Sequence, residues 1–187
     1  TDAGYIYIYG AQAEVGNISS YIPTSGSTVT RNQDLCTNGG SLASINSTEG
    51  TLYFEGSALV NGGTDRSISL SDGVGNYLRI TLHANSNRIA FFSNKGVNYN
   101  NYDFSQTDDL KIAFTYKSND WKIYINGTLK GTSTSALTFS PNTLSKLDFN
   151  LFGGNPFFGK TKALAVWKEA LSDQELADLT YPTPTFP

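Results

Sequence analysis

Short runs in which apolar and polar residues alternate, separated by turn-forming residues, fill most of this sequence and constrain its fold more than any other feature. In the segment 118–132, SNDWKIYINGTLKGT, the apolar side chains of Trp121, Ile123 and Ile125 share one parity. A period of two residues is typical of a β-strand with one buried face. The Asn-Gly pair at 126–127 favours a tight hairpin turn, because both residues tolerate positive φ. The segment therefore predicts a β-hairpin with one hydrophobic face.

The same alternation recurs in further runs, at 51–56, 66–73, 77–84, 87–94, 110–117 and 146–154. The side chains that these runs direct towards a core are Leu52, Phe54, Ile68, Leu70, Leu78, Ile80, Leu82, Ile89, Phe91, Ile112, Phe114, Tyr116, Leu147, Phe149 and Leu151. Arg79, Thr81 and His83 take the opposite, outward parity. Many short strands at this spacing predict an all-β fold with antiparallel strands, either a sandwich or a barrel.

The run 161–170, TKALAVWKEA, is apolar on both parities, as expected of a strand that is covered on both sides. We therefore assign Trp167 to the core, together with Trp121, which lies on the buried parity of its own strand.

One short helix is expected near the C-terminus, at 171–180, LSDQELADLT. Ser172 and Glu175 have the spacing of a capping box, in which each side chain accepts a hydrogen bond from the other residue's backbone N–H. The segment that follows, 181–187, contains three prolines and is predicted to be extended.

The first part of the chain has a different character. The run 5–10, YIYIYG, alternates Tyr with Ile and has two apolar faces, so we expect this strand to pair with another chain or to end an upstream domain. The polar segment after it, broken by Pro23 and Gly26, is interpreted as a linker. The predicted organisation is an N-terminal strand and linker (1–33), a β-domain (34–180) and a Pro-rich tail (181–187).

The formal net charge is -3, and the 13 Lys and Arg residues are scattered. Such a chain has no positive field for nucleic acid or anionic lipid, and no apolar run approaches the roughly 20 residues that span a bilayer. Cys36 is the only cysteine, which excludes an internal disulfide and a cysteine-based metal cage. We interpret Cys36 as a packed side chain.

Two segments of the C-terminal half carry a family resemblance. The run WKIYINGTLKG, followed by LFGGNPFFGKTKALAVWKEALSDQELADL, resembles the closing half of a laminin-G-like jelly roll of the concanavalin A-like lectin and glucanase superfamily. The resemblance covers roughly Glu49–Leu179. It implies a two-sheet antiparallel jelly-roll sandwich with one short C-terminal helix.

The front of the chain carries a second resemblance. The run YIYGAQAEVGNISSYIPTSGSTVTRNQDLC is similar to a recurrent segment in tail-fibre and other virion proteins of tailed bacteriophages. This resemblance implies a location on the virion surface, a host-cell glycan as partner, and contacts with other virion subunits in a homo-oligomer.

The residues required for catalysis are not found in the pattern of the family. Its glucanases carry Glu-x-Asp-x-x-Glu on one strand, whereas here Glu49 and Glu55 flank a strand and Asp108-Asp109 are adjacent, so they would point in opposite directions. His83 is the only histidine, and a hydrogen-bonded surface role is expected for it because no nucleophile motif accompanies it. We therefore expect a binding domain and no enzyme.

A sugar site usually combines an aromatic face with side chains that hydrogen-bond to hydroxyl groups. The segment 96–105, GVNYNNYDFS, is rich in both and is predicted to be an exposed loop, which could bind sugar or pack on its own domain. In GGNPFFGK, one of two adjacent Phe residues is expected to be exposed, unless the loop closes the end of the sandwich. The candidate carbohydrate-binding residues are Asn98, Tyr99, Asn101, Tyr102, Asp103 and Phe157.

Calcium is a further candidate ligand, because related lectins often hold it at a rim. The weak candidate ligands are Asp72, Asp103 and Asp108, although their spacing fits no recognised loop and Asp is also a common turn residue. The resulting hypothesis is a non-enzymatic, lectin-like domain of a phage surface protein. The alternative is a domain that assembles or decorates the particle without binding glycan.

Overall fold

The computed structural model describes residues 36–182 together with residues 23, 25–27 and 29. The chain divides into two compact units, Thr1–Asp34 and Leu35–Pro187, and the elements discussed below belong to the second. The strand predicted at 5–10 lies outside the described residues, as do most of the predicted linker and the tail beyond residue 182.

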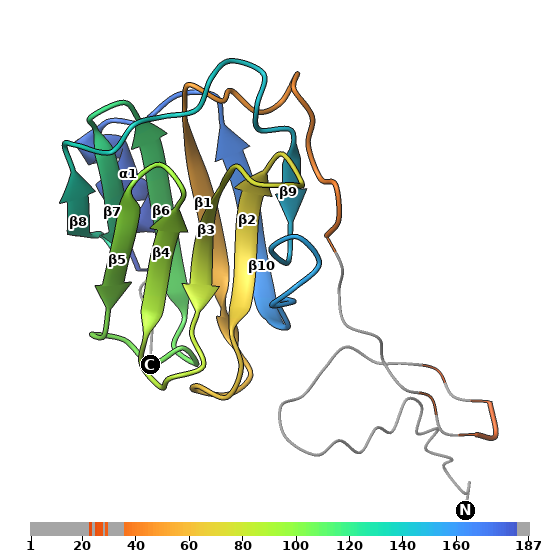
Figure 1. Cartoon of the computed structure of the whole chain (residues 1–187). Helices are drawn as coiled ribbons and strands as arrows, with labels where there is room; N and C mark the ends of the chain where they lie inside the picture. The colour runs from red at the N-terminus through yellow and green to blue at the C-terminus, as the bar shows by residue number, and fades with distance from the viewer. Residues whose placement is uncertain (1–22, 24, 28, 30–35, 183–187) are drawn as a thin grey trace, which may run out of the picture. The chain divides into compact units, whose positions relative to one another are not determined.

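The described part of the chain contains ten strands and one helix (Figure 1). They are β1 (Glu49–Ala58), β2 (Arg66–Ser71), β3 (Tyr77–Leu82), β4 (Ile89–Ser93), β5 (Val97–Asn101), β6 (Leu110–Lys117), β7 (Trp121–Ile125), β8 (Thr128–Ser133), β9 (Lys146–Asp148), β10 (Gly159–Trp167) and α1 (Asp173–Thr180). No helix among the described residues has the length and apolar character to cross a bilayer.

Two antiparallel sheets of five strands face each other, which confirms the predicted jelly-roll sandwich. The sheet nearer the viewer in Figure 1 has the order β5-β4-β3-β2-β9, and we call it the front sheet. The other has the order β10-β1-β6-β7-β8, and we call it the back sheet. The predicted hairpin joins β7 to β8 through Asn126 and Gly127, whose φ angles of 48° and 78° are those of a tight turn.

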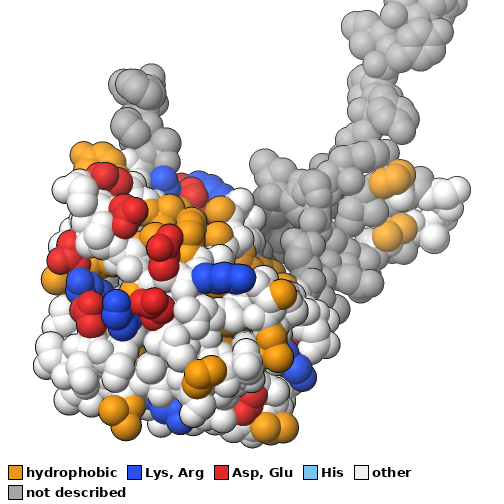
Figure 2. All heavy atoms as spheres, turned by 90° about the horizontal axis from the view of Figure 1, so that it is seen from above, with side chains coloured by type: hydrophobic (Ala, Val, Ile, Leu, Met, Phe, Trp, Pro, Cys, Tyr) orange, Lys and Arg blue, Asp and Glu red, His pale blue; other side chains and the backbone are white. Residues whose placement is uncertain are grey.

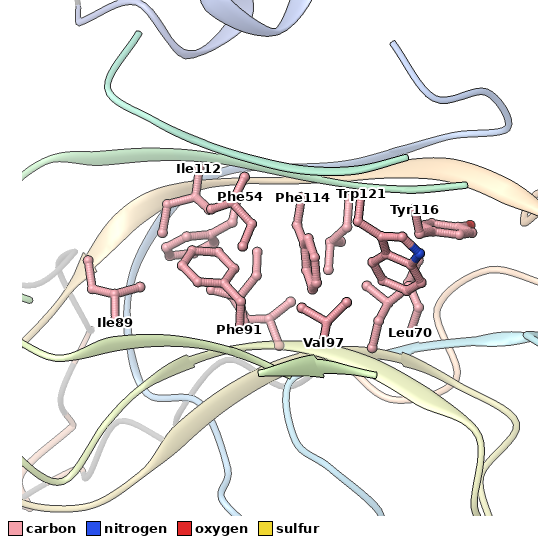
Figure 3. Close-up of a cluster of buried hydrophobic side chains, with 14 of the residues drawn as sticks. Phe54, Leu70, Ile89, Phe91, Val97, Ile112, Phe114, Tyr116 and Trp121 are labelled. Carbon is pink, nitrogen blue, oxygen red and sulfur yellow. The ribbon is translucent and has the colours of Figure 1, made fainter. Parts of the chain in front are cut away.

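The core fills the space between the sheets and follows the predicted parity. The predicted core residues of β1, β2, β3, β4 and β6 are all buried, as is Phe149, whereas Leu147 and Leu151 are only partly buried. Figure 3 shows Phe54, Phe114 and Trp121 of the back sheet packed against Phe91 and Leu70 of the front sheet. Each such side chain stabilises the fold by about 1.5–3 kcal/mol through burial.

The outer side of the back sheet is covered by α1, which lies behind the sandwich in Figure 1. The predicted capping box is present: Ser172 Oγ accepts from the backbone N–H of Glu175, and the Glu175 carboxylate accepts from the backbone N–H of Ser172. Leu176 is fully buried in a second apolar cluster with Tyr53 and Tyr124. The helix therefore gives the back sheet a second covered face.

Trp167 is a correction to the predicted core. Its ring lies on the outer side of the back sheet, 6.2 Å from the ring of Tyr53 and edge-on to it, while Leu164 and Val166 of the same strand face the main core. Both parities of β10 are apolar, so the sequence did not distinguish the two sides. The assignment of Trp121 to the main core is confirmed, at 1% exposure.

The segment predicted as an exposed loop is also a correction, because residues 97–101 form β5 at the edge of the front sheet. Val97 and Tyr99 face the core, whereas Asn98 and Asn100 face outward. An edge strand with one polar face needs few apolar residues, which explains why its sequence resembles a loop.

Candidate functional site

The outer side of the front sheet has no helix over it (Figure 1). We call this surface the open face and define it by the outward side chains of β2 to β5 and by the residue that precedes β4. Its members are Ser67, Ser69, Ser71, Tyr77, Arg79, Thr81, Arg88, Ala90, Phe92, Asn98 and Asn100. The surface is polar, with two aromatic rings and two guanidinium groups.

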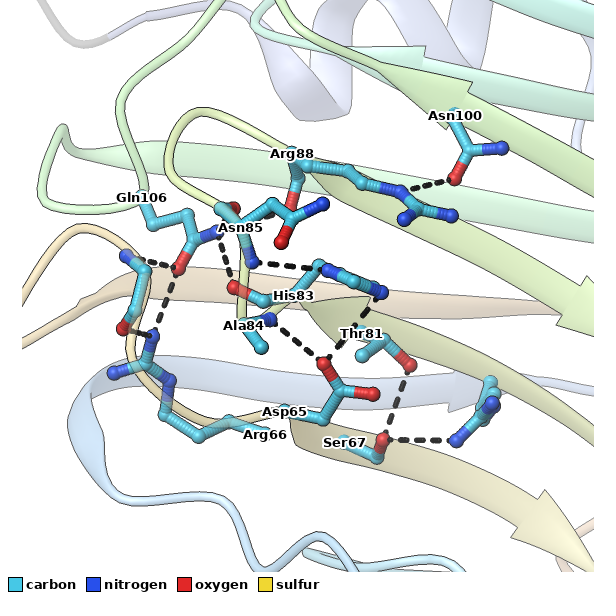
Figure 4. Close-up of polar contacts among 12 residues, drawn as sticks. Asp65, Arg66, Ser67, Thr81, His83, Ala84, Asn85, Arg88, Asn100 and Gln106 are labelled. Atoms are coloured by element: carbon cyan, nitrogen blue, oxygen red, sulfur yellow. Dashed lines mark hydrogen bonds and ion pairs between the residues drawn. The ribbon is translucent and has the colours of Figure 1, made fainter.

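Small side chains form the floor of the open face. Ser67 and Thr81 lie opposite each other on β2 and β3 with their hydroxyl oxygens 3.0 Å apart (Figure 4). Both are fully buried, as is Ala90 on the neighbouring strand. Longer side chains must therefore surround this floor.

One side of the open face is bounded by the segment between β9 and β10. Ser69 Oγ donates to the carbonyl of Asn150 at 2.6 Å, and the ring of Phe152 meets the ring of Tyr77 edge-on at 5.8 Å. Residues 150–152 thus fold against the outward side of the front sheet.

Arg79 occupies the middle of the open face, in the register row that also contains Ser69, Phe92 and Asn98. Its guanidinium carbon lies 4.8 Å from the ring centre of Phe92 and 5.9 Å from that of Tyr77. Stacking of this kind restricts the orientation of the planar guanidinium group. Desolvation by burial lowers the pKa of Arg79, opposed in part by the charges of Tyr77 and Asp65.

The hydrogen bonds of Arg79 are few. The single one within the described residues runs from Nη1 to Ser67 Oγ at 3.5 Å, and its buried Nε has no partner there. In that part of the chain no carboxylate oxygen lies within 4.0 Å of the guanidinium.

Gln106 lies in the segment between β5 and β6 and forms hydrogen bonds with the turns at one end of the open face (Figure 4). Its Nε2 donates to the carbonyl oxygens of His83, Asn85 and Arg88 at 2.8–3.0 Å. Arg88, held in this way, donates from Nε to Asn100 Oδ1 at 2.8 Å. A fully buried amide therefore positions the second guanidinium of the face.

The same amide binds a buried cation. Gln106 Oε1 accepts from Arg66 Nη2 at 2.8 Å, and Arg66 Nη2 also donates to the carbonyl of Gly62 at 2.7 Å (Figure 4). Arg66 is fully buried, and its guanidinium carbon lies 5.4 Å from the ring centre of Phe158. Desolvation lowers the pKa of Arg66, opposed in part by the charge of Asp65.

His83 has the surface role that its sequence position predicts. Its Nδ1 accepts from the backbone N–H of Asn85 at 3.0 Å, and its Nε2 lies 3.7 Å from Asp65 Oδ1. The Asp65 carboxylate also accepts from the backbone N–H of Ala84 at 2.7 Å. These contacts hold the turn that follows β3.

The structure separates the residues that were predicted to bind the sugar. Asn98 is exposed and belongs to the open face. Tyr99 turns inward, 6.1 Å from the ring of Phe91, and lines a hollow of about 150 Å³ together with Trp121. Asn101 is only 4% exposed. Alternation along β5 therefore divides residues that adjoin in the sequence.

The other two predicted residues of this segment lie beyond β5. Tyr102 is 59% exposed, outside the open face. Asp103 accepts from Lys130 at 2.9 Å and from Asn101 at 3.0 Å, and these hydrogen bonds, with that of Lys130 the larger cause, lower its pKa.

Phe157 is a correction, because its side chain is 2% exposed and unavailable to a ligand. Its ring packs in the core, 5.3 Å from the ring of Phe54 and 5.3 Å from that of Phe149. Its neighbour Phe158 takes the opposite direction, towards Arg66.

The carboxylates of the three calcium candidates are held by separate hydrogen bonds, those of Asp103 coming from Lys130 and Asn101. Asp72 Oδ1 accepts from the backbone N–H groups of Val74, Gly75 and Asn76, and Asp108 accepts from the backbone N–H of Ser105. Among the described residues no group of three His, Cys, Asp or Glu side chains could hold a metal ion.

The acids considered for hydrolysis lie far apart. Glu49 begins β1 and Glu55 lies within it, both on its outer side, six residues or about 20 Å apart. Retaining and inverting glycosidases need carboxyl groups about 5–9.5 Å apart. Glu49 pairs with Lys117 at 3.2 Å, and Glu55 accepts from the Tyr53 hydroxyl at 3.0 Å.

The sequence reasoning did not select Arg79, Tyr77, Phe92 or Arg88 as site residues. The available signal was the outward parity of Arg79 in the run 77–84. What places it beside Phe92 is the pairing of β3 with β4.

Residues 30–177 match a protein-family model described as the concanavalin A-like lectin/glucanases superfamily. A comparison with curated proteins gave no significant match.

Solved structures with the same fold include sugar-bound modules. A carbohydrate-binding module (CBM40) of the Ruminococcus gnavus IT-sialidase, bound to α2,3-sialyllactose, has a TM-score of 0.58 at 16% identity, over 71% of this chain and 83% of that one. Domain 4 of AbnA, an extracellular arabinanase from Geobacillus stearothermophilus, in complex with arabinotriose, has a TM-score of 0.61 at 13% identity, over 75% and 70%.

Part of an enzyme chain also has this fold. The leech intramolecular trans-sialidase, in complex with 2,7-anhydro-Neu5Ac, has a TM-score of 0.58 at 18% identity, over 74% of this chain. The match spans only 24% of the leech protein. At these identities the likeness concerns the fold.

Proposed function

Because this chain belongs to the concanavalin A-like lectin/glucanase superfamily, we propose that its jelly roll is a non-enzymatic carbohydrate-binding domain and that the open face binds the glycan. The Ruminococcus module with the same fold is a carbohydrate-binding module, a non-catalytic kind of domain. The observation that carries the proposal is the row Arg79, Phe92 and Asn98, in which an aromatic ring stands between hydrogen-bonding groups on an uncovered sheet.

The chemistry of the open face fits a sugar. Phe92 and Tyr77 offer apolar contact area for the C–H groups of a ring, and Asn98 and Arg88 offer hydrogen-bonding groups for its hydroxyls. Because the face is built on strands, its side chains are held more firmly than those of a loop.

The test is a glycan array probed with the full chain and with the variants Phe92→Ala and Asn98→Ala. Each variant should bind roughly tenfold or more weakly, the loss expected when about 1.4 kcal/mol of contact energy is removed. Tyr102→Ala is the matched control, because Tyr102 is exposed outside the open face and should bind normally. Unchanged binding by both variants with correct folding, or the absence of any bound glycan, would exclude the proposal.

We also propose that the domain serves on the surface of a tailed-phage particle, as part of a tail fibre or another virion protein, and contacts host-cell glycan there. The support is the similarity of the front segment of the chain to segments of such proteins. In a homo-oligomer, weak binding at each copy is multiplied by simultaneous engagement. Gold-labelled antibody against the chain should label purified particles in electron micrographs, and unlabelled particles would contradict this location.

The alternative, that the domain only assembles or decorates a particle, makes a different prediction. The open face would then be covered by neighbouring subunits. Open-face variants would change the sedimentation of the chain, and neither they nor the wild type would bind glycan.

A further inference from the structure

We propose that the glycan is acidic and that Arg79 binds its carboxylate group. This inference rests on the proposed function of the open face and names the class of sugar that the face selects.

Arg79 has unused hydrogen-bonding capacity. A guanidinium group has five N–H donors in a planar fork. In the described part of the chain, Arg79 has one long hydrogen bond, a buried Nε without a partner and no carboxylate within 4.0 Å. A partly desolvated charge without a counter-charge is unfavourable, so an anion placed there is stabilised.

The ion-paired lysines and their acidic partners differ in location from Arg79. Lys117, Lys122, Lys130 and Lys162 each have a carboxylate within 4.0 Å, and all four belong to strands of the back sheet. On a view of the molecule from above, basic and acidic side chains accordingly lie side by side (Figure 2). Arg79 of the front sheet differs from these lysines, because no such carboxylate accompanies it.

Asp65, an acidic residue near this end of the front sheet, already has partners within the protein. Asp65 accepts from the backbone N–H of Ala84 and lies against His83, as Figure 4 shows. Its charge reaches Arg79 only at a distance and forms no ion pair with it. Asp148 lies opposite Ser69 in the same register row as Arg79, and its carboxylate accepts from the backbone N–H of Asn38. Among the described residues, an outside anion at Arg79 therefore competes with no carboxylate within 4.0 Å.

Two aromatic rings hold the Arg79 guanidinium in position before a ligand binds. The rings of Phe92 and Tyr77 lie 4.8 and 5.9 Å from its carbon and restrict its plane. A held planar fork suits the two oxygens of a carboxylate and reduces the entropy lost on binding. Arg88 adds a second positive charge to the same face, held by Asn100.

The register of the front sheet places Phe92 and Asn98 in one row with Arg79. Asn98 lies opposite Phe92, and Phe92 lies opposite Arg79, so Asn98 is two strands or about 10 Å from Arg79. A sugar with its carboxylate at Arg79 would lie over Phe92 and reach Asn98 with a hydroxyl group. A polyanion such as nucleic acid would need many more cations than this face holds, on a chain of net charge -3.

The test uses the full chain and a matched pair of probes, tetragalacturonate and the same oligosaccharide after its carboxylates have been reduced to hydroxymethyl groups. A second pair is 3′-sialyllactose and lactose. Isothermal titration should show tighter binding of the acidic member of at least one pair, by roughly tenfold. This comparison needs no variant, so it remains decisive if a substitution prevents folding.

Two variants identify the residue. Arg79→Gln should remove the preference for the acidic member of that pair, so that the two members bind equally. Arg79→Lys keeps the charge but loses the fork, and should lose most of the preference. Lys168→Gln removes one positive charge from an exposed site outside the open face and should behave as the wild type.

The outcomes separate this inference from the proposed function. Equal affinity of the wild type for the acidic and neutral members of both pairs, with binding abolished by Phe92→Ala, would overturn the acidic-sugar inference and leave the open face as a site. Equal affinity for a sulfated probe without a carboxylate would overturn the assignment to a carboxylate. No binding to any probe or array glycan would overturn both proposals.

Discussion

Asn98 and Tyr99 are neighbours on β5, yet one faces the solvent and the other packs on Phe91. Phe157 and Phe158 divide in the same way, one towards Phe54 in the core and one towards Arg66. The pleat of an extended chain sends adjacent side chains in opposite directions, so a cluster in the sequence seldom forms a cluster in space. A site on a sheet is built from alternate residues of several strands.

Phe157→Ala should reduce the free energy of unfolding by about 3–5 kcal/mol, because it removes a buried ring and leaves a cavity. Urea denaturation measures the change. Phe152→Ala is the control: this residue is 43% exposed, and its loss should cost less than about 1 kcal/mol. A small effect at Phe157 combined with lost glycan binding would return it to the list of ligand residues.

Asp72 should make the stability of the domain depend on pH in acid. Desolvation opposes its ionisation, but hydrogen bonds from Gly75, Val74 and Asn76 outweigh it and hold the pKa of Asp72 well below its usual range. The group therefore stabilises the fold fully above the unfolded pKa of about 3.9, and this contribution is lost as pH falls towards the lower folded pKa. In Asp72→Asn, urea denaturation from pH 7 to 2 should show a shallower acid decline, and curves parallel to the wild type would contradict the assignment.

Two local elements could be predicted from a few residues each. The β7–β8 turn follows from an Asn-Gly pair, and the start of α1 follows from Ser172 and Glu175. Both depend on contacts between residues close in the chain. The edge strand β5 could not be recognised, because its extended conformation is imposed by pairing with β4, and its own residues are mostly polar.

Ser172→Ala should reduce the free energy of unfolding by about 1 kcal/mol, because it removes the capping hydrogen bond to Glu175. Thermal denaturation followed by circular dichroism measures the change. Ser135→Ala, at an exposed site between β8 and β9, serves as the control and should change stability by less than about 0.5 kcal/mol. Equal effects of the two substitutions would show that the cap contributes nothing.

Gln106→Ala should destabilise the turn at 83–88 as well as the whole domain. The change removes the hydrogen bonds of this amide to three backbone carbonyls and to Arg66. The carbonyls of Asn85 and Arg88 keep a backbone N–H partner, whereas that of His83 loses its partner, and an unsatisfied buried group costs about 1–3 kcal/mol. Hydrogen exchange should then become faster in residues 83–88. Thr107→Ala, its exposed neighbour, is the control, and normal protection in Gln106→Ala would contradict the role of this amide.

Across the whole molecule, the sequence predicts the class of fold and most of the core but not the candidate site. Parity identifies which side chains of β1 to β4 and β6 face inward without any knowledge of neighbours. The open face depends on which strands adjoin: Arg79 and Phe92 meet because β3 pairs with β4, and Gln106 reaches His83 across the end of the sheet. Such contacts follow from topology, which here was available only through the family resemblance.

The most direct test of the open face as the binding surface is a ¹H–¹⁵N NMR titration of the chain with a glycan that it binds. We expect shift changes concentrated at Arg79, Phe92 and Asn98, in fast exchange if binding at each site is weak. Changes confined to α1, to residues 102–109 or to the hollow of about 330 Å³ between Leu42 and Pro141 would contradict it.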